Sequence, residues 1–139
     1  MLAETAKEFT EPMQLKLASQ DEVFVATATG RVSVQAVLRV FKNVIDTAAE
    51  RGFDKILMDF LAVTGELAVM DLYEIGKGMA EYCESKSISP KVALMGKPPL
   101  VTGFGAEVAS NRGLISMTFS ERQPALNWLH AFSQEAPGS

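Results

Sequence analysis

Apolar and polar positions along the chain switch repeatedly between a two-residue period and a helical period. Alternation over residues 13–17 and a β-branched, aromatic run over residues 22–29 predict two strands, with residues 19–21 as the turn of a β-hairpin. Apolar residues then recur at helical spacing over residues 34–48, and Ser33 is placed to cap the start of that helix. The chain therefore opens with a hairpin followed by a helix.

The same switching continues to the end of the chain. Three short apolar runs predict further strands, at residues 54–60, 91–95 and 114–119. Further helices are expected at about residues 69–86, at residues 106–111, and after the capping-box sequence that begins at Ser120. The order is β-β-α-β-α-β-α-β-α, which predicts an α/β domain with a mixed, mostly parallel five-stranded sheet and about four helices.

Two glycines interrupt the second helix. Gly76 and Gly78 weaken a helix by up to ~1 kcal/mol each relative to alanine. Their presence predicts that this helix packs closely against a neighbour.

The length of 139 residues and the hydrophobic content of 47% fit one domain with its own core. We assign residues 13–132 to this single domain, residues 1–12 to an N-terminal extension and residues 133–139 to a flexible tail. The net charge of −4 and the lack of a Lys/Arg cluster argue against nucleic acid as a partner.

Cysteine content and hydropathy predict the compartment. Cys83 is the only cysteine, so an intrachain disulfide is excluded and a reducing compartment is expected, with the thiol packed in an apolar helical stripe. The chain shows neither a secretory signal nor an apolar run near the ~20 residues of a membrane span. We therefore expect a cytoplasmic protein with no membrane span.

Strand ends of a parallel sheet meet along one edge, where ligands and partners bind. Gly30, Asp59, Gly96 and Phe119 each close a predicted strand that leads into a helix. We expect them along one edge and call the loops that follow them the rim.

Several segments together resemble a known family. They are the strand Lys55-Ile-Leu-Met-Asp59, the strand Lys91-Val-Ala-Leu-Met95, and Asn111-Arg-Gly113 leading to Phe119-Ser120 and Ala125-Leu-Asn-Trp-Leu129. With the order of elements, they resemble the STAS-like proteins related to bacterial anti-sigma-factor antagonists, over residues 13–132. The resemblance implies a STAS-like fold, which is also similar to CRAL-TRIO lipid-binding domains, and a function in binding a partner protein.

The best-known members of that family are switched by phosphorylation of a serine at the start of the helix after the central strand, in an Asp-Ser-Ser-Gly-Leu type of motif. The matching region here is Thr64-Gly-Glu-Leu-Ala68, in which Gly65 and Glu66 offer no hydroxyl. The serine switch therefore does not carry over. Thr64 is one position off the expected register and is either a phosphosite or a residue that bonds to backbone, while Glu66 could supply a permanent negative charge near a helix N-terminus.

Catalytic chemistry has few candidates. His130, the sole histidine, falls on the polar side of the last helix, where an exposed surface role is favoured over a catalytic base. Asp59, Glu66 and Asp71 could converge as an acid/base pair or hard-cation site, but structural roles in backbone bonding and helix starts compete with that interpretation. Gly103-Phe-Gly105 lacks the context of a phosphate loop. We expect no enzyme activity, cofactor or metal.

The loop over residues 98–104 is unusually apolar. Leu100, Val101 and Phe104 must pack on the core, form a dimer interface or line the mouth of an apolar pocket. Arg112 could pair with a carboxylate or an anionic ligand, or serve only the helix C-terminus.

Three functions remain open, and the first is favoured. It is a non-enzymatic regulatory module whose partner, an unidentified protein, docks on the rim. The second is a small-molecule or lipid-binding module with an apolar pocket near residues 100–104, and the third is an enzyme that uses the acidic residues with a divalent cation. Homodimerisation is compatible with all three. The residues assigned to the binding rim are Asp59, Thr64, Glu66, Asp71, Lys97, Leu100, Val101, Phe104 and Arg112.

Overall fold

The computed structural model describes residues 13–135, so the predicted extension at residues 1–12 and residues 136–139 of the predicted tail lie outside it. The predicted hairpin consists of β1 (Gln14–Gln20) and β2 (Val23–Arg31), which pair antiparallel. Asp21 and Glu22 join them, with φ of 52° and 69°, as a two-residue turn with positive φ at both positions requires. The turn is thus shorter than the one predicted at residues 19–21.

The remaining elements follow in the predicted order. They are α2 (Val34–Glu50), β3 (Lys55–Thr64), α3 (Val69–Ser85), β4 (Lys91–Met95), α4 (Phe104–Asn111), β5 (Ile115–Phe119) and α5 (Arg122–Glu135). The hydroxyl of Ser33 accepts a hydrogen bond from the Ala36 N–H at 3.1 Å, which confirms its capping role at α2. Helix α5 continues to Glu135, beyond the predicted domain end at residue 132.

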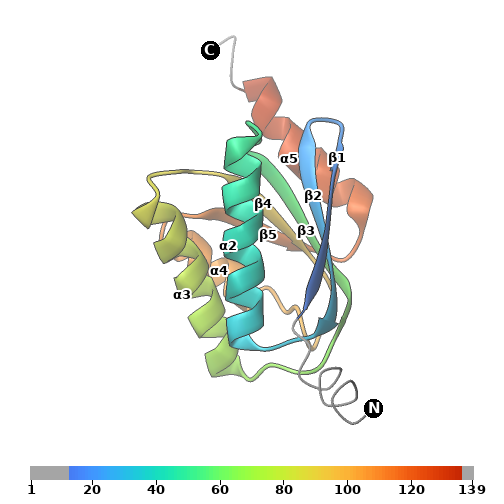
Figure 1. The fold of residues 1–139 in the computed structure, drawn as a ribbon, viewed down its shortest axis with the longest axis vertical. Helices are drawn as coiled ribbons and strands as arrows, with labels where there is room; N and C mark the ends of the chain where they lie inside the picture. The colour runs from blue at the N-terminus through green and yellow to red at the C-terminus, as the bar shows by residue number, and fades with distance from the viewer. Residues whose placement is uncertain (1–12, 136–139) are drawn as a thin grey trace, which may run out of the picture.

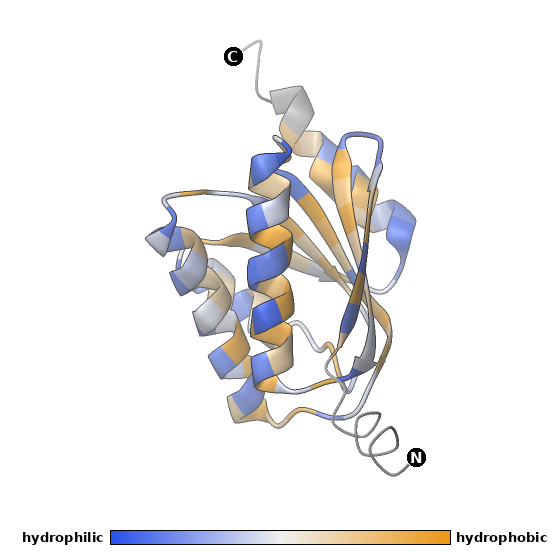
Figure 2. Ribbon diagram, viewed as in Figure 1, coloured by the Kyte–Doolittle hydropathy of each residue, from blue (hydrophilic) through white to orange (hydrophobic). Residues whose placement is uncertain are grey.

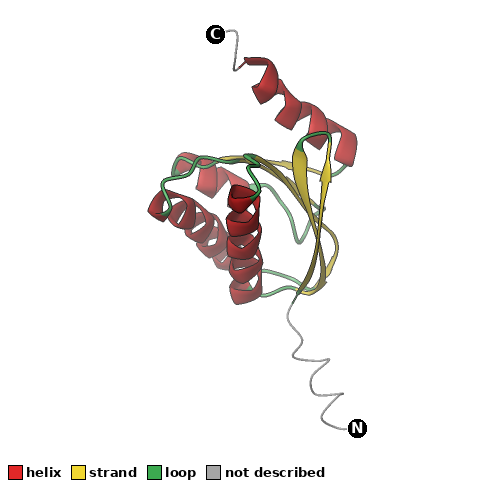
Figure 3. Ribbon diagram, turned by 45° about the horizontal axis from the view of Figure 1, so that its top comes forward, coloured by secondary structure: helices red, strands yellow, loops and turns green. Residues whose placement is uncertain are grey.

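The sheet has the strand order β1-β2-β3-β4-β5, with every pair after the hairpin parallel. Each right-handed crossover steps in the same direction across the sheet, so the crossover helices all lie on one face. Figures 1 and 3 show α2, α3 and α4 on that face and α5 on the other. The mixed, mostly parallel five-stranded sheet predicted from the sequence is confirmed.

Successive strand residues supply two separate cores. Ile56 and Met58 of β3 face the larger core under α2, α3 and α4, whereas Leu57 between them faces the smaller core. Leu126 and Leu129 of α5 close that smaller core. Figure 2 shows the matching pattern on α2, whose hydrophobic positions face the sheet and whose hydrophilic positions face away.

The two glycines of α3 lie at close helix contacts, as predicted. A Cβ on Gly76 would lie 2.9 Å from the Cβ of Val108 in α4, and one on Gly78 would lie 2.8 Å from Cδ2 of Leu38 in α2. The atoms near Gly76 are backbone atoms and a Cβ, so α4 packs this closely against α3 only because residue 76 lacks a side chain. The atoms near Gly78 are the end of the flexible Leu38 side chain, which can move.

Strand β3 is longer than predicted. It runs to Thr64 rather than ending at residue 60, and β2 continues beside it so that Gly30 lies opposite Val63. Asp59 is level with Met95 and Phe119, the last residues of β4 and β5. Asp59, Gly96 and Phe119 therefore lie at one level of the sheet, although Asp59 does not end its strand. Gly30 lies at the end of β2, as predicted, but farther along the β2–β3 ribbon.

Candidate interaction site

Asp59 holds a β-bulge in place. The register between β2 and β3 shifts between Thr27 and Thr29, so Phe60 and Leu61 share one position opposite Ala28. The Asp59 Oδ1 accepts a hydrogen bond from the Leu61 N–H at 3.0 Å, and its Oδ2 lies 3.2 Å from Nη2 of Arg122. This carboxylate is buried and has a structural role.

Asp59 is also on the wrong face for the predicted site. Its side chain pairs with Arg122 of α5, and its neighbour two residues back, Leu57, belongs to the core under α5. Leu100 belongs instead to the core under α2, α3 and α4. The sheet thus separates Asp59 from the apolar loop that we expected beside it.

Two carboxylates lie near the start of α3: one forms a capping hydrogen bond and the other is exposed. Asp71 Oδ2 accepts a hydrogen bond from the Ala68 N–H at 2.9 Å at the start of α3, a capping role. Thr64 Oγ1 donates to the backbone oxygen of Gly30 at 3.2 Å, which agrees with a backbone-bonding role. Glu66 is exposed. It is the carboxylate of this segment that remains available to a partner.

The apolar loop divides between core and surface. Leu100 is buried in the larger core, and Val101 packs against that core while the Val101 N–H donates to the oxygen of Lys97 at 2.9 Å. Lys97 itself is exposed. Phe104 is 37% exposed and belongs to the first turn of α4, because that helix begins two residues earlier than predicted. Core packing therefore accounts for Leu100 and Val101, and Phe104 is left at the surface.

A cavity of about 50 Å³ lies beneath this loop. Its lining is almost wholly apolar and includes Phe60, Leu72, Leu94, Leu100 and Ala106. Pockets for small organic ligands have volumes of roughly 300–1,000 Å³. The space near residues 100–104 is thus a partly open apolar hollow that is too small for a lipid.

The most exposed large apolar side chains lie beside this cavity and were missed by sequence reasoning. Val69 and Met70, in the first turn of α3, are 67% and 65% exposed. Leu67 and Leu72, which flank them, line the cavity together with Gly103 and Gly105, which flank Phe104. We call Glu66, Val69, Met70 and Phe104 the rim patch. The available signal was that Val69 and Met70 are apolar yet fall outside the buried stripe of their helix.

Arg112 does not belong to the rim patch. It caps the far end of α4 from Phe104, and its Nη2 donates to the hydroxyl of Tyr73 at 2.9 Å, with the guanidinium 5.8 Å from the centre of that ring. Of the alternatives left open for Arg112, its position at the C-terminus of α4 is the one that the structure shows, and its hydrogen-bond partner in the described chain is a tyrosine rather than a carboxylate. Its assignment to the binding rim stays a prediction.

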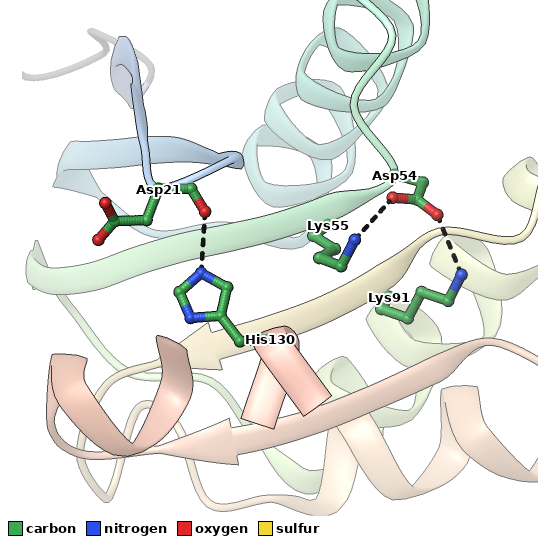
Figure 4. A network of polar contacts seen from close by, with 5 residues as sticks. All are labelled: Asp21, Asp54, Lys55, Lys91 and His130. Carbon is green, nitrogen blue, oxygen red and sulfur yellow. Dashed lines mark hydrogen bonds and ion pairs between the residues drawn. The ribbon is translucent and has the colours of Figure 1, made fainter. Parts of the chain in front are cut away.

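Other polar groups form contacts elsewhere on the sheet, shown in Figure 4. Nε2 of His130 lies 2.8 Å from the backbone oxygen of Asp21 and links α5 to the hairpin turn. Asp54 lies between Lys55 at 3.5 Å and Lys91 at 3.1 Å. Partial burial raises the pKa of Asp54, but the hydrogen bond and charge of Lys91, together with Lys55, outweigh it and hold this pKa below its ordinary value of 3.8.

Residues 13–135 contain no group of three or more His, Cys, Asp or Glu side chains arranged to hold a metal ion. Asp59 and Asp71, two of the three candidate carboxylates, already accept backbone N–H groups. Burial raises the pKa of the Cys83 thiol to about 11, so this thiol is neutral near pH 7 and packs as an apolar group. Every helix of the described chain is too short or too polar to span a bilayer.

No protein-family model and no curated protein matches this sequence. Solved structures do match. An anti-sigma factor antagonist from Mycobacterium paratuberculosis is 10% identical, with a TM-score of 0.55 over 85% of this chain and 94% of that one. An uncharacterised protein with a SpoIIAA-like fold from Shewanella loihica is 16% identical, with a TM-score of 0.52 over 85% of this chain and 93% of that one. At such identities the likeness shows the fold: this chain has the STAS-like fold that its sequence predicted.

Proposed function

We propose that this protein is a non-enzymatic regulatory module that acts by binding a partner protein through the rim patch. The observation that carries the proposal is the exposure of Val69 and Met70, 67% and 65%, at the start of α3. Exposed apolar side chains grouped beside a charged residue are typical of protein interaction sites. The similarity to a protein named as an anti-sigma factor antagonist supports a regulatory role.

The patch suits a partner with an apolar anchor and a basic group. Met70 offers an unbranched side chain that adapts to the shape of a partner. Glu66 adds a negative charge beside the N-terminus of α3, and α3 begins with backbone N–H groups that favour that charge. Because Gly65 and Glu66 replace hydroxyl-bearing residues of the family motif, we infer a surface whose charge is permanent rather than switched by phosphorylation.

The test compares Met70→Glu with Met117→Glu as baits in affinity capture from native cell extract, read by quantitative mass spectrometry. Both positions are exposed, 65% and 46%, and Met117 lies on β5, outside the rim patch. A partner should be retained by the wild type and by Met117→Glu but lost from Met70→Glu. Recovery of no protein, or equal retention by the two variants, contradicts the proposal.

A second comparison addresses the charge. Glu66→Lys should weaken binding of the captured partner, and Glu66→Gln should weaken it less, because reversal adds repulsion where neutralisation only removes attraction. Equal affinities of both variants and the wild type would exclude a role for this carboxylate.

A further inference from the structure

The hollow beneath the apolar loop opens within the rim patch. Its floor is buried and includes Leu94 and Ala106, whereas the lining residues that reach the surface mark its mouth. Among these, Leu67 is half-buried just before α3, and Thr102 is exposed just before α4. The mouth therefore lies between the starts of α3 and α4, and those two helix starts carry the apolar side chains of the rim patch.

The lining of the hollow suits an apolar group better than water. Among the described residues that line it, only Thr102 and Thr118 have polar side chains. The Oγ1 of Thr102 already accepts a hydrogen bond from the Phe104 N–H at 3.3 Å. A buried water molecule needs about two to four polar partners. The side chains around the hollow offer too few of these to hold an ordered water.

The volume of the hollow limits the size of the group that fits. A water molecule takes about 30 Å³ of liquid volume, and a methyl group is of similar size, so a hollow of about 50 Å³ holds one or two such groups. A cavity that accepts a benzene ring is about three times larger, at roughly 150 Å³. The end of an aliphatic side chain matches the hollow, with its stem in the mouth, whereas an aromatic ring does not.

The small size also distinguishes a side chain from a free ligand. Even the best small ligands gain a limited free energy per heavy atom, so a free molecule of three or four heavy atoms binds weakly. A side chain that belongs to a partner protein adds its burial to a larger contact around the mouth. Val69 and Met70, 67% and 65% exposed, provide that surrounding contact. A side chain of a protein is therefore the favoured occupant.

We propose that the hollow receives one aliphatic side chain, from a leucine, isoleucine or valine of the partner protein that docks on the rim patch. This inference rests on the proposed function and adds to it the chemistry of the residue that the partner inserts. Glu66 is exposed and directly precedes Leu67 at the mouth. A lysine or arginine next to the inserted residue complements this charge, so the partner presents an aliphatic residue beside a basic one.

Ala106→Val tests the proposal by filling the hollow from its floor. Ala106 is 5% exposed and lines the hollow, so two added methyl groups occupy the space that the inserted side chain needs. The affinity of full-length protein for the captured partner, measured by isothermal titration calorimetry, should fall by about tenfold, as expected for the lost burial of about two methyl groups. Ala18→Val adds the same groups at an exposed position of β1 and should bind like the wild type.

The variants separate this inference from the proposed function. If Met70→Glu loses the partner while a folded Ala106→Val keeps the wild-type affinity, the hollow is not the insertion site and the proposed function stands. If the wild type binds no partner, the proposed function and this inference both fail. A thermal melt establishes that each variant is folded before its affinity is compared.

Xenon gives a second readout that needs neither a partner nor a substitution. The xenon atom is apolar and enters small apolar cavities. In the full-length, methyl-labelled wild type, xenon under pressure should shift the NMR signals of the methyl groups of Leu72 and Leu100, which line the hollow, but not that of Met117 on β5. Ala106→Val should remove these shifts. Signals of Leu72 and Leu100 that do not respond in the wild type, or shifts that persist in Ala106→Val, overturn the proposal.

Discussion

A single added methyl group tests the contact between α3 and α4. In Gly76→Ala the new Cβ would lie 2.9 Å from the Cβ of Val108 and 3.2 Å from the backbone N of Ala109, and would also press on the oxygen of Gly105. All these neighbours are backbone atoms or a Cβ, so no rotamer change can relieve the overlap. Helix α4 as a whole must move away from α3.

The expected free energy follows from two opposing effects. Overpacking of this kind costs about 1–3 kcal/mol. Replacing glycine by alanine within a helix stabilises the helix by about 0.8–1.0 kcal/mol through its higher helix propensity. Because three rigid atoms crowd the new Cβ, we take the upper half of the overpacking range, about 2–3 kcal/mol. After subtraction of the helix-propensity gain, Gly76→Ala should lower the free energy of unfolding by about 1–2 kcal/mol, which corresponds to roughly 3–10 °C in Tm for a domain of this size.

Gly78→Ala, two residues along the same helix, is the matched control. Its Cβ would meet only the side chain of Leu38, at 2.8 Å from Cδ2, and Leu38 is half-buried and able to turn. A strained rotamer costs about 0.5–1.5 kcal/mol, close to the gain in helix propensity, so the change should be near neutral. Thermal and urea unfolding followed by circular dichroism measure both variants. Equal stabilities, or a Gly76→Ala protein that melts at or above the wild type, would refute the reasoning.

Three further predictions concern titratable groups. Burial raises the pKa of Cys83 to about 11, so a thiol reagent at pH 8 should label this residue only after unfolding. The contribution of the neutral thiol to the free energy of unfolding should be present below the ordinary pKa of 9.0 and lost as pH rises through the pKa of the folded state. The pKa of Asp54 is lowered in the folded protein. The contribution of its carboxylate to the free energy of unfolding should therefore be present above the ordinary pKa of 3.8 and lost as pH falls through the pKa of the folded state. Asp54→Asn should flatten the acid limb of a stability-versus-pH curve, and an unchanged limb would contradict the role of Lys91. Asp59→Ala should cost about 1–3 kcal/mol in urea unfolding because it leaves the Leu61 N–H at the bulge without its acceptor, whereas Asp59→Asn keeps an acceptor and should cost less.

Periodicity predicted most of this fold because it reports directly on burial. The helix stripes, the short apolar strands and the packing glycines of α3 all follow from which side chains avoid water. The extension of β3 could not be found this way: the bulge at Phe60 and Leu61 breaks the two-residue alternation, so residues 61–64, although apolar or β-branched, do not continue the pattern of residues 54–60. Only the pairing of residues 29–31 with β3 makes that segment a strand.

The site was predicted less completely because it depends on which face each residue occupies. Alternation along β3 places the side chains of Asp59 and Leu57 on one face of the sheet and the side chain of Met58 on the other. It gives no indication that α5 alone covers the face that carries Asp59. In the same way Val69 and Met70 were read only as members of a helix, whereas their exposure depends on where α4 and the apolar loop come to rest.

The order of strands in the sheet, β1 to β5 in sequence, has a consequence for how the chain folds during synthesis. Each strand pairs with the one made just before it, so every new strand can dock on an edge that already exists when it leaves the ribosome. No gap has to be left between two strands for a later strand to fill. Pairing between residues distant in sequence is the slow step in the folding of many sheets, and here each such pairing spans only one crossover connection. Growth of the sheet ends at β5, so one of its two edges is also the last strand to form.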